Sequence, residues 1–356
     1  MTDFQQILLT HYERYPAMTG QDFAKLIFQS EFGVAHFVSP GVVWQRLQEE
    51  YTGCQRRPEP EVVPPVFEDI GGGYGRVNLL PLPGSGLSLT TVLQWFTLTA
   101  EKPINAARAV EEKLELLLDL SRRGEIKLPY SELVEFIKDF REAGYPAQHH
   151  SEVYRARYQP AYRVVDRRFI EFSQVFAQID SLLGRKTHVL VAIDGNSGAG
   201  KSSLARLLSK VYDCSVFHMD DFFLPQEMKT CSRLNEPGGN VHYERFYSEV
   251  MLNLAAQRPF KYRAFDCRSQ SCAEEQLVVP KRLSVVEGVY SLHPVLARFY
   301  DLKIVIHVDP KTQRERILAR SGPALLARFE AEWIPLENRY FQELAVSDKA
   351  DLVLNT

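Results

Sequence analysis

The sequence predicts an α/β fold for the C-terminal half, preceded by a mainly helical N-terminal domain with a small β element. The length of 356 residues favours about two domains, because one domain typically has roughly 150 residues. From His188 onward, short apolar strands alternate with helices, which is typical of a parallel sheet. Before about residue 160, apolar residues instead recur at helical spacings.

The N-terminal elements are predicted from this spacing and from residues that typically start helices or form turns. Thr19-x-x-Asp22 is typical of a helix start, in which each side chain caps the other's backbone. Gly71-Gly72-Gly73-Tyr74-Gly75 lies within 67–80 and predicts a hairpin or a glycine-rich turn. It does not predict nucleotide binding, because it lacks the G-x-G-x-x-G order and no long helix begins directly after it. Further helices are expected at 40–50, 89–100, 105–123 and 131–143.

A long amphipathic segment, from about Val164 to Leu183, joins the two halves and ends at Gly184. We therefore predict a mainly helical domain of unassigned role at 1–160, a linking helix at 161–187 and an α/β domain at 188–356.

Composition excludes several classes of protein. A net charge of −3 with 45% hydrophobic and 24% charged residues is ordinary for a globular protein, and it argues against disorder or a basic nucleic-acid wrapper. Apolar runs fall short of the ~18 residues that a membrane span needs, and the first residues lack the features of a signal peptide. Five cysteines suit reduced thiols. We expect a cytoplasmic protein with no membrane partner and no zinc cluster.

The strongest motif follows the apolar run Val189–Ile193. The next eight residues match G-x-x-x-x-G-K-[ST], and a helix follows through about Val211. Glycines let backbone amides turn towards phosphate oxygens at a helix N-terminus. The motif predicts nucleoside triphosphate binding by Gly195, Asn196, Ser197, Gly198, Ala199, Gly200, Lys201, Ser202 and Ser203.

Acidic residues follow two other predicted strands. Asp220 and Asp221 come after the strand Cys214–His218, and Glu287 ends the run that begins at Leu283. Ligands of open α/β sheets bind at the carboxyl ends of the strands. Ser202 and Glu287 are therefore candidate Mg²⁺ ligands. The alternatives are a solvated turn for the two aspartates and a helix cap for Glu287.

Arginines are grouped before a helix break at Ser321-Gly322-Pro323. Arg316 and Arg320 are four residues apart, so they share a helix face, and Arg314 is nearby. Guanidinium groups on a mobile helical lid would suit the charge of a transferring phosphoryl group. An ordinary charged helix face is the alternative.

Residues 188–356 resemble the P-loop kinases of the uridine kinase, nicotinamide riboside kinase and phosphoribulokinase group. The resemblance implies a five-stranded parallel sheet flanked by helices, with ATP and Mg²⁺ as cofactors. It also implies that Asp220 is the base on the acceptor hydroxyl, with Asp221 as a neighbour of less defined role. The segments that carry it are Asp194–Ser202, Met219–Phe223, Glu287–Tyr290, Val308–Pro310 with the arginines beyond, and Ala350–Leu354.

The acceptor region is expected between the first acid pair and the third strand, where the resembling kinases bind their substrates. The candidates there are Arg233, His242, Arg245 and Tyr262, together with Asp221. Their spacing departs from the nucleoside-kinase pattern, which puts uridine itself in doubt. For His242 alone, a structural hydrogen bond competes with substrate contact.

The segment 155–168 holds five arginines and is the most basic part of the first half. One interpretation is an anion site that faces the kinase cleft, with Arg163 binding an anionic group of the acceptor. The other is a surface or interdomain salt-bridge network. RNA binding is not favoured, because no recognised RNA-binding signature accompanies these residues.

Together these observations predict an ATP-dependent phosphotransferase, a kinase with an alcohol group as acceptor. Its partner would be a nucleoside-like or other sugar-containing small molecule, with an anionic acceptor left open. The alternative is an ATP-binding regulatory module, in which nucleotide occupancy controls the N-terminal domain and a partner. Asp220 and the paired arginines favour the enzyme, because a switch needs no acceptor base.

Overall fold

The computed structural model describes residues 3–34, 40–100, 108–266 and 269–356. The chain forms two compact units, Met1–Ala177 and Gln178–Thr356, which we call the N-terminal and the C-terminal unit. Across the described residues, none of the helices combines the length and the apolar character that a membrane crossing requires.

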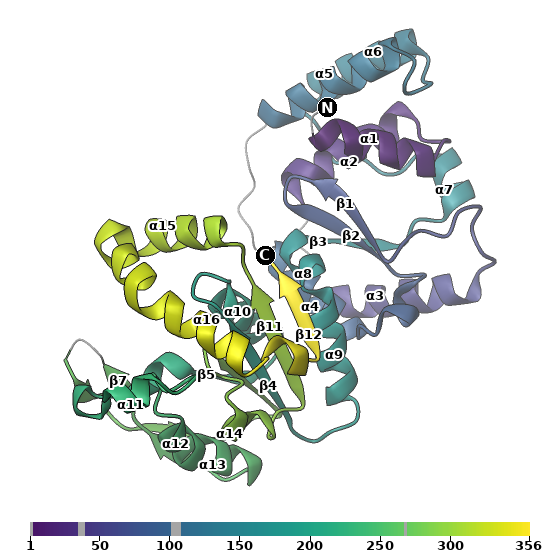
Figure 1. Cartoon of the computed structure of the whole chain (residues 1–356). Helices are drawn as coiled ribbons and strands as arrows, with labels where there is room; N and C mark the ends of the chain where they lie inside the picture. The colour runs from purple at the N-terminus through teal and green to yellow at the C-terminus, as the bar shows by residue number, and fades with distance from the viewer. Residues whose placement is uncertain (1–2, 35–39, 101–107, 267–268) are drawn as a thin grey trace. The chain divides into compact units, whose positions relative to one another are not determined.

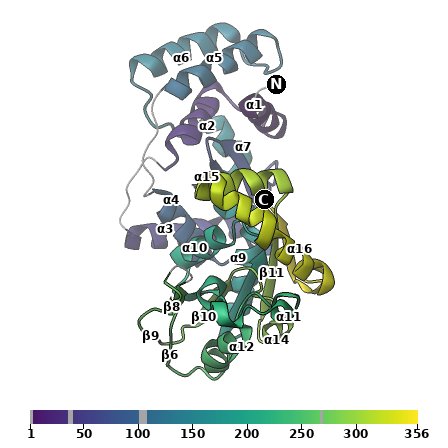
Figure 2. The same ribbon diagram turned by 60° about the vertical axis from the view of Figure 1, so that its left-hand side comes forward.

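The N-terminal unit combines helices with a three-stranded antiparallel sheet in the order β1-β2-β3. Helices α5 and α6 lie alongside one another next to α2 (Figures 1 and 2). The elements are α1 (Asp3–Arg14), α2 (Gly20–Phe32), α3 (Pro40–Arg56), β1 (Phe67–Gly71), β2 (Tyr74–Asn78), η1 (Leu82–Ser85), α4 (Leu89–Ala100), α5 (Arg108–Arg122), α6 (Tyr130–Glu142), α7 (Glu152–Tyr158), β3 (Tyr162–Asp166), α8 (Arg167–Glu171) and α9 (Ser173–Leu183).

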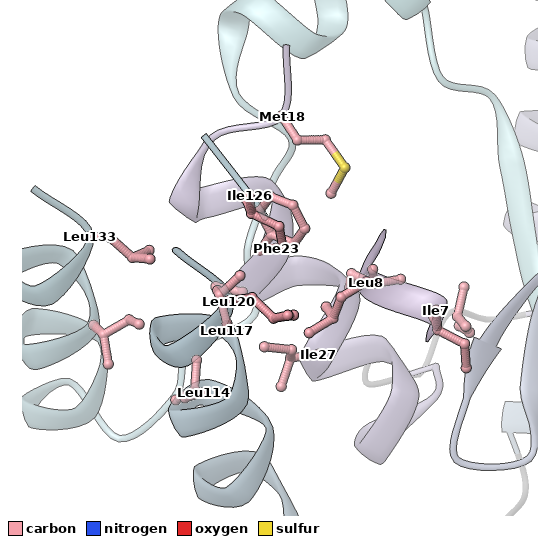
Figure 3. Packing of buried hydrophobic residues seen from close by; sticks show 14 of the residues in the cluster. Ile7, Leu8, Met18, Phe23, Ile27, Leu114, Leu117, Leu120, Ile126 and Leu133 are labelled. Carbon is pink, nitrogen blue, oxygen red and sulfur yellow. The ribbon is translucent and has the colours of Figure 1, made fainter. Parts of the chain in front are cut away.

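The core of this unit follows the apolar spacing of its helices. Leu8 of α1, Phe23 and Ile27 of α2, and Leu114 and Leu117 of α5 are fully buried against one another (Figure 3). The predicted capping box at the start of α2 is present, with the Asp22 carboxylate accepting the Thr19 backbone amide at 3.0 Å. The hairpin predicted within 67–80 is β1 paired with β2. The parts of the predicted 105–123 helix before residue 108 lie outside the described residues.

The predicted linking helix at 161–187 differs from the structure. Residues 162–166 form β3, which pairs with β2 and completes the sheet. Val164 and Val165 are buried β-branched residues, and such residues favour strands. The Asp166 side chain then accepts the Arg168 amide and begins α8. Helices α8 and α9 both lie within the range expected to be helical, and the boundary between the units falls within α9.

The C-terminal unit is built on a five-stranded sheet in the order β12-β11-β4-β10-β5, whose neighbouring strands all run parallel. This confirms the predicted five-stranded parallel sheet. Helix α10 packs against β4, β5 and β10 (Figure 1). The bounds are β4 (Val189–Gly195), α10 (Lys201–Val211), β5 (Cys214–His218), β10 (Leu283–Glu287), β11 (Leu302–His307) and β12 (Leu352–Asn355).

Alternate side chains of the strands pack into a second cluster. Leu190 and Ala192 of β4 pack with Phe217, Phe222 and Phe246. The remaining elements of this unit are η2 (Met219–Phe222), η3 (Gln226–Met228), α11 (Cys231–Leu234), α12 (Tyr243–Phe246), η4 (Tyr247–Met251), α13 (Leu252–Ala255), β6 (Phe260–Tyr262), β7 (Phe265–Asp266), β8 (Ser271–Cys272), β9 (Gln276–Val278), α14 (Pro294–Ala297), α15 (Pro310–Arg328), η5 (Phe329–Trp333), α16 (Ile334–Glu343) and η6 (Ser347–Lys349).

Register places the carboxyl ends of three strands together. Glu287 of β10 lies opposite Ile193 of β4 on one side and opposite His218 of β5 on the other. Because the strands are parallel, the loops that follow them meet at one edge of the sheet. The phosphate-binding loop and both acidic motifs of the sequence belong to this edge.

Candidate active site

The loop after β4 has the backbone conformation that phosphate binding requires. Gly195, Gly198 and Gly200 have positive φ angles of 148°, 81° and 95°. A Cβ atom on Gly195 would lie 2.2 Å from the carbonyl oxygen of Ile306, so no larger residue fits there. Gly200 caps α10 without a side-chain hydrogen bond. The first amides of a helix have no partner within it, so this end of α10 is suited to an anion.

Lys201 reaches back across the loop that precedes it. Its Nζ donates to the carbonyl oxygens of Gly195 at 2.9 Å and of Asn196 at 3.0 Å, and the side chain is buried. These two bonds hold a positive charge beside the amides of the loop. The cradle therefore fits the phosphates of a nucleoside triphosphate.

Two oxygen donors lie next to the loop. The Ser202 hydroxyl donates to Glu287 Oε1 at 3.0 Å, and His218 Nδ1 lies 2.5 Å from the same oxygen. Burial raises the pKa of Glu287, but His218 and Lys201 outweigh burial and hold that pKa below its usual value. The Glu287 carboxylate is thus ionised, and with the Ser202 hydroxyl it offers the hard oxygen ligands that Mg²⁺ prefers.

Asp220 and Asp221 lie on η2, the short 3₁₀ turn that follows β5. Met219 and Phe222, on either side of the pair, are buried and anchor the turn. Asp220 itself is exposed at the surface, yet partial desolvation raises its pKa. Lys201 lowers that pKa and the charge of Glu287 raises it, while the positive charges of His218 and Arg320 also lower it. A carboxylate with a raised pKa is better suited to accept a proton.

Asp194, which directly precedes the loop, has no role in the sequence analysis. Its fully buried carboxylate accepts hydrogen bonds from the amides of Gly195 (2.7 Å), Tyr290 (3.2 Å) and Leu292 (2.9 Å), and from the Tyr340 hydroxyl (2.8 Å). Burial nevertheless raises the pKa of Asp194 to about 6. The position of Asp194, an acid at the end of a wholly apolar strand, could have predicted that it has a role in the site.

Helix α16 also contacts the loop, a contact that no sequence motif predicts. The buried Glu337 carboxylate accepts the Ser197 amide at 2.8 Å and the Ser197 hydroxyl at 2.5 Å. From α15, the Gln313 amide donates to the Ser197 carbonyl oxygen at 2.8 Å. These contacts fix the loop at Ser197, just before the amides that face the phosphate position.

The three arginines of α15 have different surroundings. Arg316 Nη1 donates to the Gly198 carbonyl at 3.2 Å, so this side chain lies against the loop. Arg320 lies over the Phe329 ring, and Arg314 pairs with Glu330 at 3.3 Å. The helix is interrupted at Gly322, where φ is 79° and ψ is 171°. The break expected there is confirmed.

Three acceptor-region candidates surround Phe222, the residue after Asp221. The guanidinium of Arg245 lies 4.3 Å from the centre of the Phe222 ring, and the buried Tyr262 ring stacks on it at 5.6 Å. The His242 amide donates to the Phe222 carbonyl at 2.7 Å. Burial and the neighbouring Asp221 raise the pKa of Tyr262 to about 12, so its hydroxyl remains protonated.

Arg233 has a more structural environment. It forms two hydrogen bonds with Glu244, at 2.7 and 2.8 Å, and it also donates to the carbonyl oxygens of Gly239 and Val241. These bonds tie the segment 233–244 together. The role of Arg233 in substrate binding stays a prediction.

Arg163 belongs to the N-terminal unit, where it pairs with Glu50 at 2.6 Å. Other arginines of the segment 155–168 also pair with acids of their own unit. These pairs are Arg157–Glu61 at 3.9 Å, Arg167–Asp69 at 3.1 Å and Arg168–Asp166 at 2.7 Å. The expectation that this segment faces the kinase cleft remains a prediction.

The sheet order and the loop geometry together define the architecture. The C-terminal unit has a P-loop α/β fold, in which the glycine-rich loop follows the central strand of a parallel sheet. No family model matches the chain, and no curated protein matches it either. Solved structures are similar to about half of it. A possible uridine kinase from Bacillus stearothermophilus has 20% sequence identity over 51% of this chain and 99% of that one, with a TM-score of 0.39.

Two further similar structures carry kinase names. For a putative fructose transport system kinase from Silicibacter sp. TM1040, identity is 23% over 48% of this chain and 91% of that one, with a TM-score of 0.37. For a shikimate kinase from Bacteroides thetaiotaomicron, identity is 13% over 47% of this chain and 86% of that one, with a TM-score of 0.27. Each similarity leaves about half of this chain without a counterpart.

Proposed function

We propose that the C-terminal unit transfers the γ-phosphoryl group of ATP to a hydroxyl of a small metabolite. The observation that carries the proposal is the position of Asp220. This acid with a raised pKa lies at the same sheet edge as the phosphate-binding loop, within the electrostatic field of Lys201 and Glu287. A nucleotide-binding site alone has no need of such an acid.

The residues would divide the work as follows. The amides of the loop and Lys201 bind the phosphates, and Ser202 and Glu287 hold Mg²⁺. Bound ATP with Mg²⁺ supplies the transferable phosphoryl group and part of the charge neutralisation. Asp220 accepts the proton of the acceptor hydroxyl, while Arg316 and Arg320 stabilise negative charge on the phosphoryl oxygens.

The acceptor we propose is a nucleoside or another sugar-containing compound. The sequence resemblance supports this class, and so do the side chains next to Asp221. Arg245 and the Tyr262 hydroxyl can hydrogen-bond the hydroxyl groups of a sugar, and the Tyr262 ring offers a flat surface. An acceptor with an anionic group is compatible with Arg245.

A screen for stabilising ligands tests the proposal. Nucleosides, sugars and vitamins would be added singly to the full chain with Mg²⁺ and a non-hydrolysable ATP analogue, and the melting temperature recorded. A kinase is expected to be stabilised further by one acceptor class, which should then accept ³²P from labelled ATP. Stabilisation by the nucleotide alone, with no transfer to any compound, would instead support the regulatory module.

A further inference from the structure

A cavity lies entirely within the N-terminal unit. Its volume is about 320 Å³, which is near the lower end of the roughly 300–1,000 Å³ found for small-molecule sites. It is formed by α2, α3, α4, β3 and the segment before α7. The residues that matter for its chemistry are Lys25, Phe28, Arg46, Phe96, Tyr162 and Arg163.

The charges that line the cavity are mainly positive. Lys25, Arg46 and Arg163 line it, and Glu50 is the single carboxylate among the described lining residues. Glu50 is occupied by its ion pair with Arg163 at 2.6 Å. Arg46 is exposed and forms no ion pair with a described residue. The cavity therefore has an excess of positive charge, which favours an anion.

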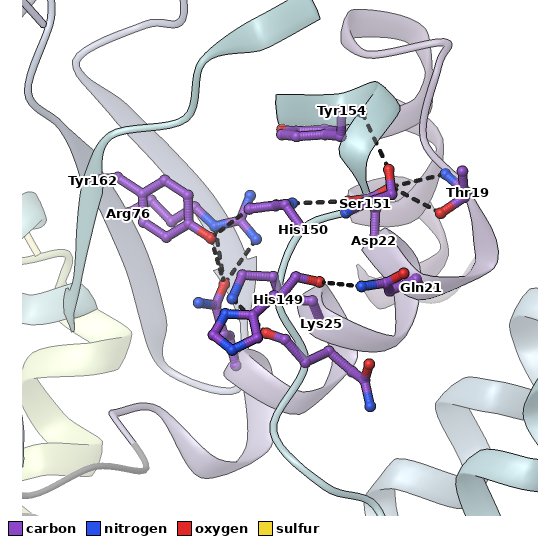
Figure 4. Close-up of polar contacts among 12 residues, drawn as sticks. Thr19, Gln21, Asp22, Lys25, Arg76, His149, His150, Ser151, Tyr154 and Tyr162 are labelled. Atoms are coloured by element: carbon purple, nitrogen blue, oxygen red, sulfur yellow. Dashed lines mark hydrogen bonds and ion pairs between the residues drawn. The ribbon is translucent and has the colours of Figure 1, made fainter. Parts of the chain in front are cut away.

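A buried arginine lies behind the wall of the cavity. Arg76 is almost completely buried, stacks 4.4 Å from the centre of the Tyr162 ring, and donates to Gln29 Oε1 at 3.1 and 2.7 Å (Figure 4). Among the described carboxylates none lies within ion-pair distance of it, although the charge of Glu68 acts on it from further away. Burial lowers the pKa of Arg76, but Tyr162 and Glu68 help to outweigh burial and the pKa is raised, so the guanidinium keeps its positive charge beside the cavity.

Tyr162, which lines the cavity, is held in place by a hydrogen-bond network. His150 Nδ1 lies 2.9 Å from the Asp22 carboxylate and His150 Nε2 lies 2.8 Å from the Tyr162 hydroxyl (Figure 4). Burial lowers the pKa of His150 to about 4, so the ring is neutral at pH 7. Its Nδ1–H therefore donates to the carboxylate, and its Nε2 accepts from Tyr162. The position of the Tyr162 ring is thereby fixed.

Lys25 also lines the cavity. Its Nζ donates to the carbonyl oxygen of Gln148 at 2.7 Å, which leaves two further N–H donors. Burial, with the charge of Arg76, lowers the pKa of Lys25 to about 8. A ligand carboxylate or phosphate would relieve this cost by accepting from the ammonium group.

We propose that this cavity binds a small organic anion, a carboxylate or a phosphate ester attached to an aromatic or apolar body. The anionic group contacts Lys25 and Arg46, and the body packs against Phe28, Phe96 and Tyr162. The side chains of Val43 and Val164 complete the apolar wall. This site is independent of the proposed kinase reaction and is present even if the C-terminal unit transfers no phosphate.

Simple probes test the site in the full chain. The phosphate-binding loop is first saturated with Mg²⁺ and a non-hydrolysable ATP analogue, and binding is then measured by calorimetry. The probes are phenyl phosphate, phenylacetate, phenol and inorganic phosphate. At least one aromatic anion should bind roughly tenfold or more tightly than phenol, because a charged hydrogen bond contributes about 1.5–3 kcal/mol. Inorganic phosphate, which lacks the apolar body, should also bind more weakly.

Two variants locate the binding. Ala147→Trp places a bulky side chain at an exposed position of the lining and should abolish binding of the aromatic anions. Arg46→Gln should weaken binding at least severalfold, while Arg56→Gln, which removes the same charge from an exposed position of α3 outside the cavity, should leave it unchanged. The melting temperature of each variant checks that the unit is folded.

The outcomes separate the possibilities. Tighter binding of phenylacetate indicates a carboxylate ligand, and tighter binding of phenyl phosphate indicates a phosphate ester. The proposal is overturned if neither anion binds, if phenol binds equally well, or if folded Ala147→Trp binds like the unaltered protein. Equal weakening by Arg46→Gln and Arg56→Gln would also overturn it, since the effect would then be one of net charge.

Discussion

Two carboxylates, Asp22 in the N-terminal unit and Asp220 in the C-terminal unit, have opposite surroundings. Asp22 in the N-terminal unit is fully buried and accepts hydrogen bonds from Thr19, Ser151 and His150. Burial alone would raise its pKa, but these bonds hold the pKa at about 2. Asp220 in the C-terminal unit is exposed and accepts no hydrogen bond from a described residue, and its pKa is raised.

This difference in hydrogen bonding distinguishes a carboxylate that stabilises the fold from one that is available for chemistry. A carboxylate whose lone pairs are all engaged stabilises the fold and cannot take up a proton near neutral pH. A carboxylate that is exposed and accepts no hydrogen bond from the protein keeps its lone pairs for a substrate. The contrast predicts that substitutions at the two positions affect different measurements.

The largest effect is expected for Asp220→Asn. An amide cannot accept the acceptor's proton, so phosphoryl transfer should fall by about 10²–10⁴-fold with little change in ATP affinity. Steady-state transfer to the acceptor found in the screen, with calorimetry of the ATP analogue, measures both. Asp221→Asn is the matched control. A large loss in the control, with none in Asp220→Asn, would move the base to Asp221.

Lys201→Ala should reduce transfer by roughly 10²–10³-fold and also weaken binding of the ATP analogue, because it removes a donor from the phosphate site. The fold should persist, since among the described residues Lys201 donates to just two carbonyl groups, both of the loop. Lys210→Ala, an exposed lysine at the other end of α10, serves as control. Transfer at the unaltered rate in Lys201→Ala would refute the role of this loop.

The sequence predicted the C-terminal unit well because its signals are local. The loop motif, the strand before it and the break at Gly322 each depend on neighbouring residues. Glu337 contacts Ser197 across 140 positions of the chain, and no local pattern encodes such a contact. Asp194 was quoted within a motif, but its role depends on amides beyond β10 and on Tyr340.

The N-terminal unit was predicted less completely for the same reason. Its helices follow from apolar spacing, but β3 pairs with β2, which is about 90 residues earlier in the chain. The segment from Tyr162 also fits a helical period, and tertiary pairing decided in favour of a strand. The cavity had no signal at all, because its lining comes from five separate segments.

Asp22→Asn should lower the stability of the N-terminal unit and leave nucleotide binding unchanged, whereas Asp220→Asn is expected to lower phosphoryl transfer. The amide keeps one acceptor oxygen and loses the other, which leaves buried donors of Ser151 or Thr19 unpaired. The free energy of unfolding of the N-terminal unit should fall by about 2–4 kcal/mol, with ATP-analogue binding unchanged. Asp139→Asn, at an exposed residue of α6, is the control. An unaltered free energy of unfolding would show that the network contributes nothing.

Tryptophan fluorescence isolates this measurement. In a Trp333→Phe background the remaining tryptophans, Trp44 and Trp95, both belong to the N-terminal unit. Urea unfolding followed in this way reports on that unit alone.

Acid should destabilise the N-terminal unit through the same network. The pKa of Asp22 is about 2 in the folded protein, below its ordinary value of 3.8, so its contribution to stability is present above pH 4 and is lost as the pH falls towards 2. This corresponds to about 2 kcal/mol. The lowered pKa of His150 acts in the same direction between pH 6.5 and 4. The stability gap between the unaltered protein and Asp22→Asn should therefore shrink between pH 5 and 2.5, and a constant gap would contradict the assignment.

The smallest effect is expected for the pair of Arg163 and Glu50, and it tests whether the two units are functionally separate. The Arg163 side chain is 11% exposed and that of Glu50 is 48% exposed, so their coupling should be only about 0.2–1 kcal/mol. A double-mutant cycle of Arg163→Ala and Glu50→Ala, measured by urea unfolding, gives this value. If the pair is structural, the acceptor KM should be unchanged in all three variants. A raised KM in Arg163→Ala, with the free energy of unfolding unaltered, would assign Arg163 to the acceptor. The N-terminal unit would then supply a residue of the active site. Its polar groups could no longer be assigned to stability alone, and the contrast between Asp22 and Asp220 would not extend to the two units as a whole.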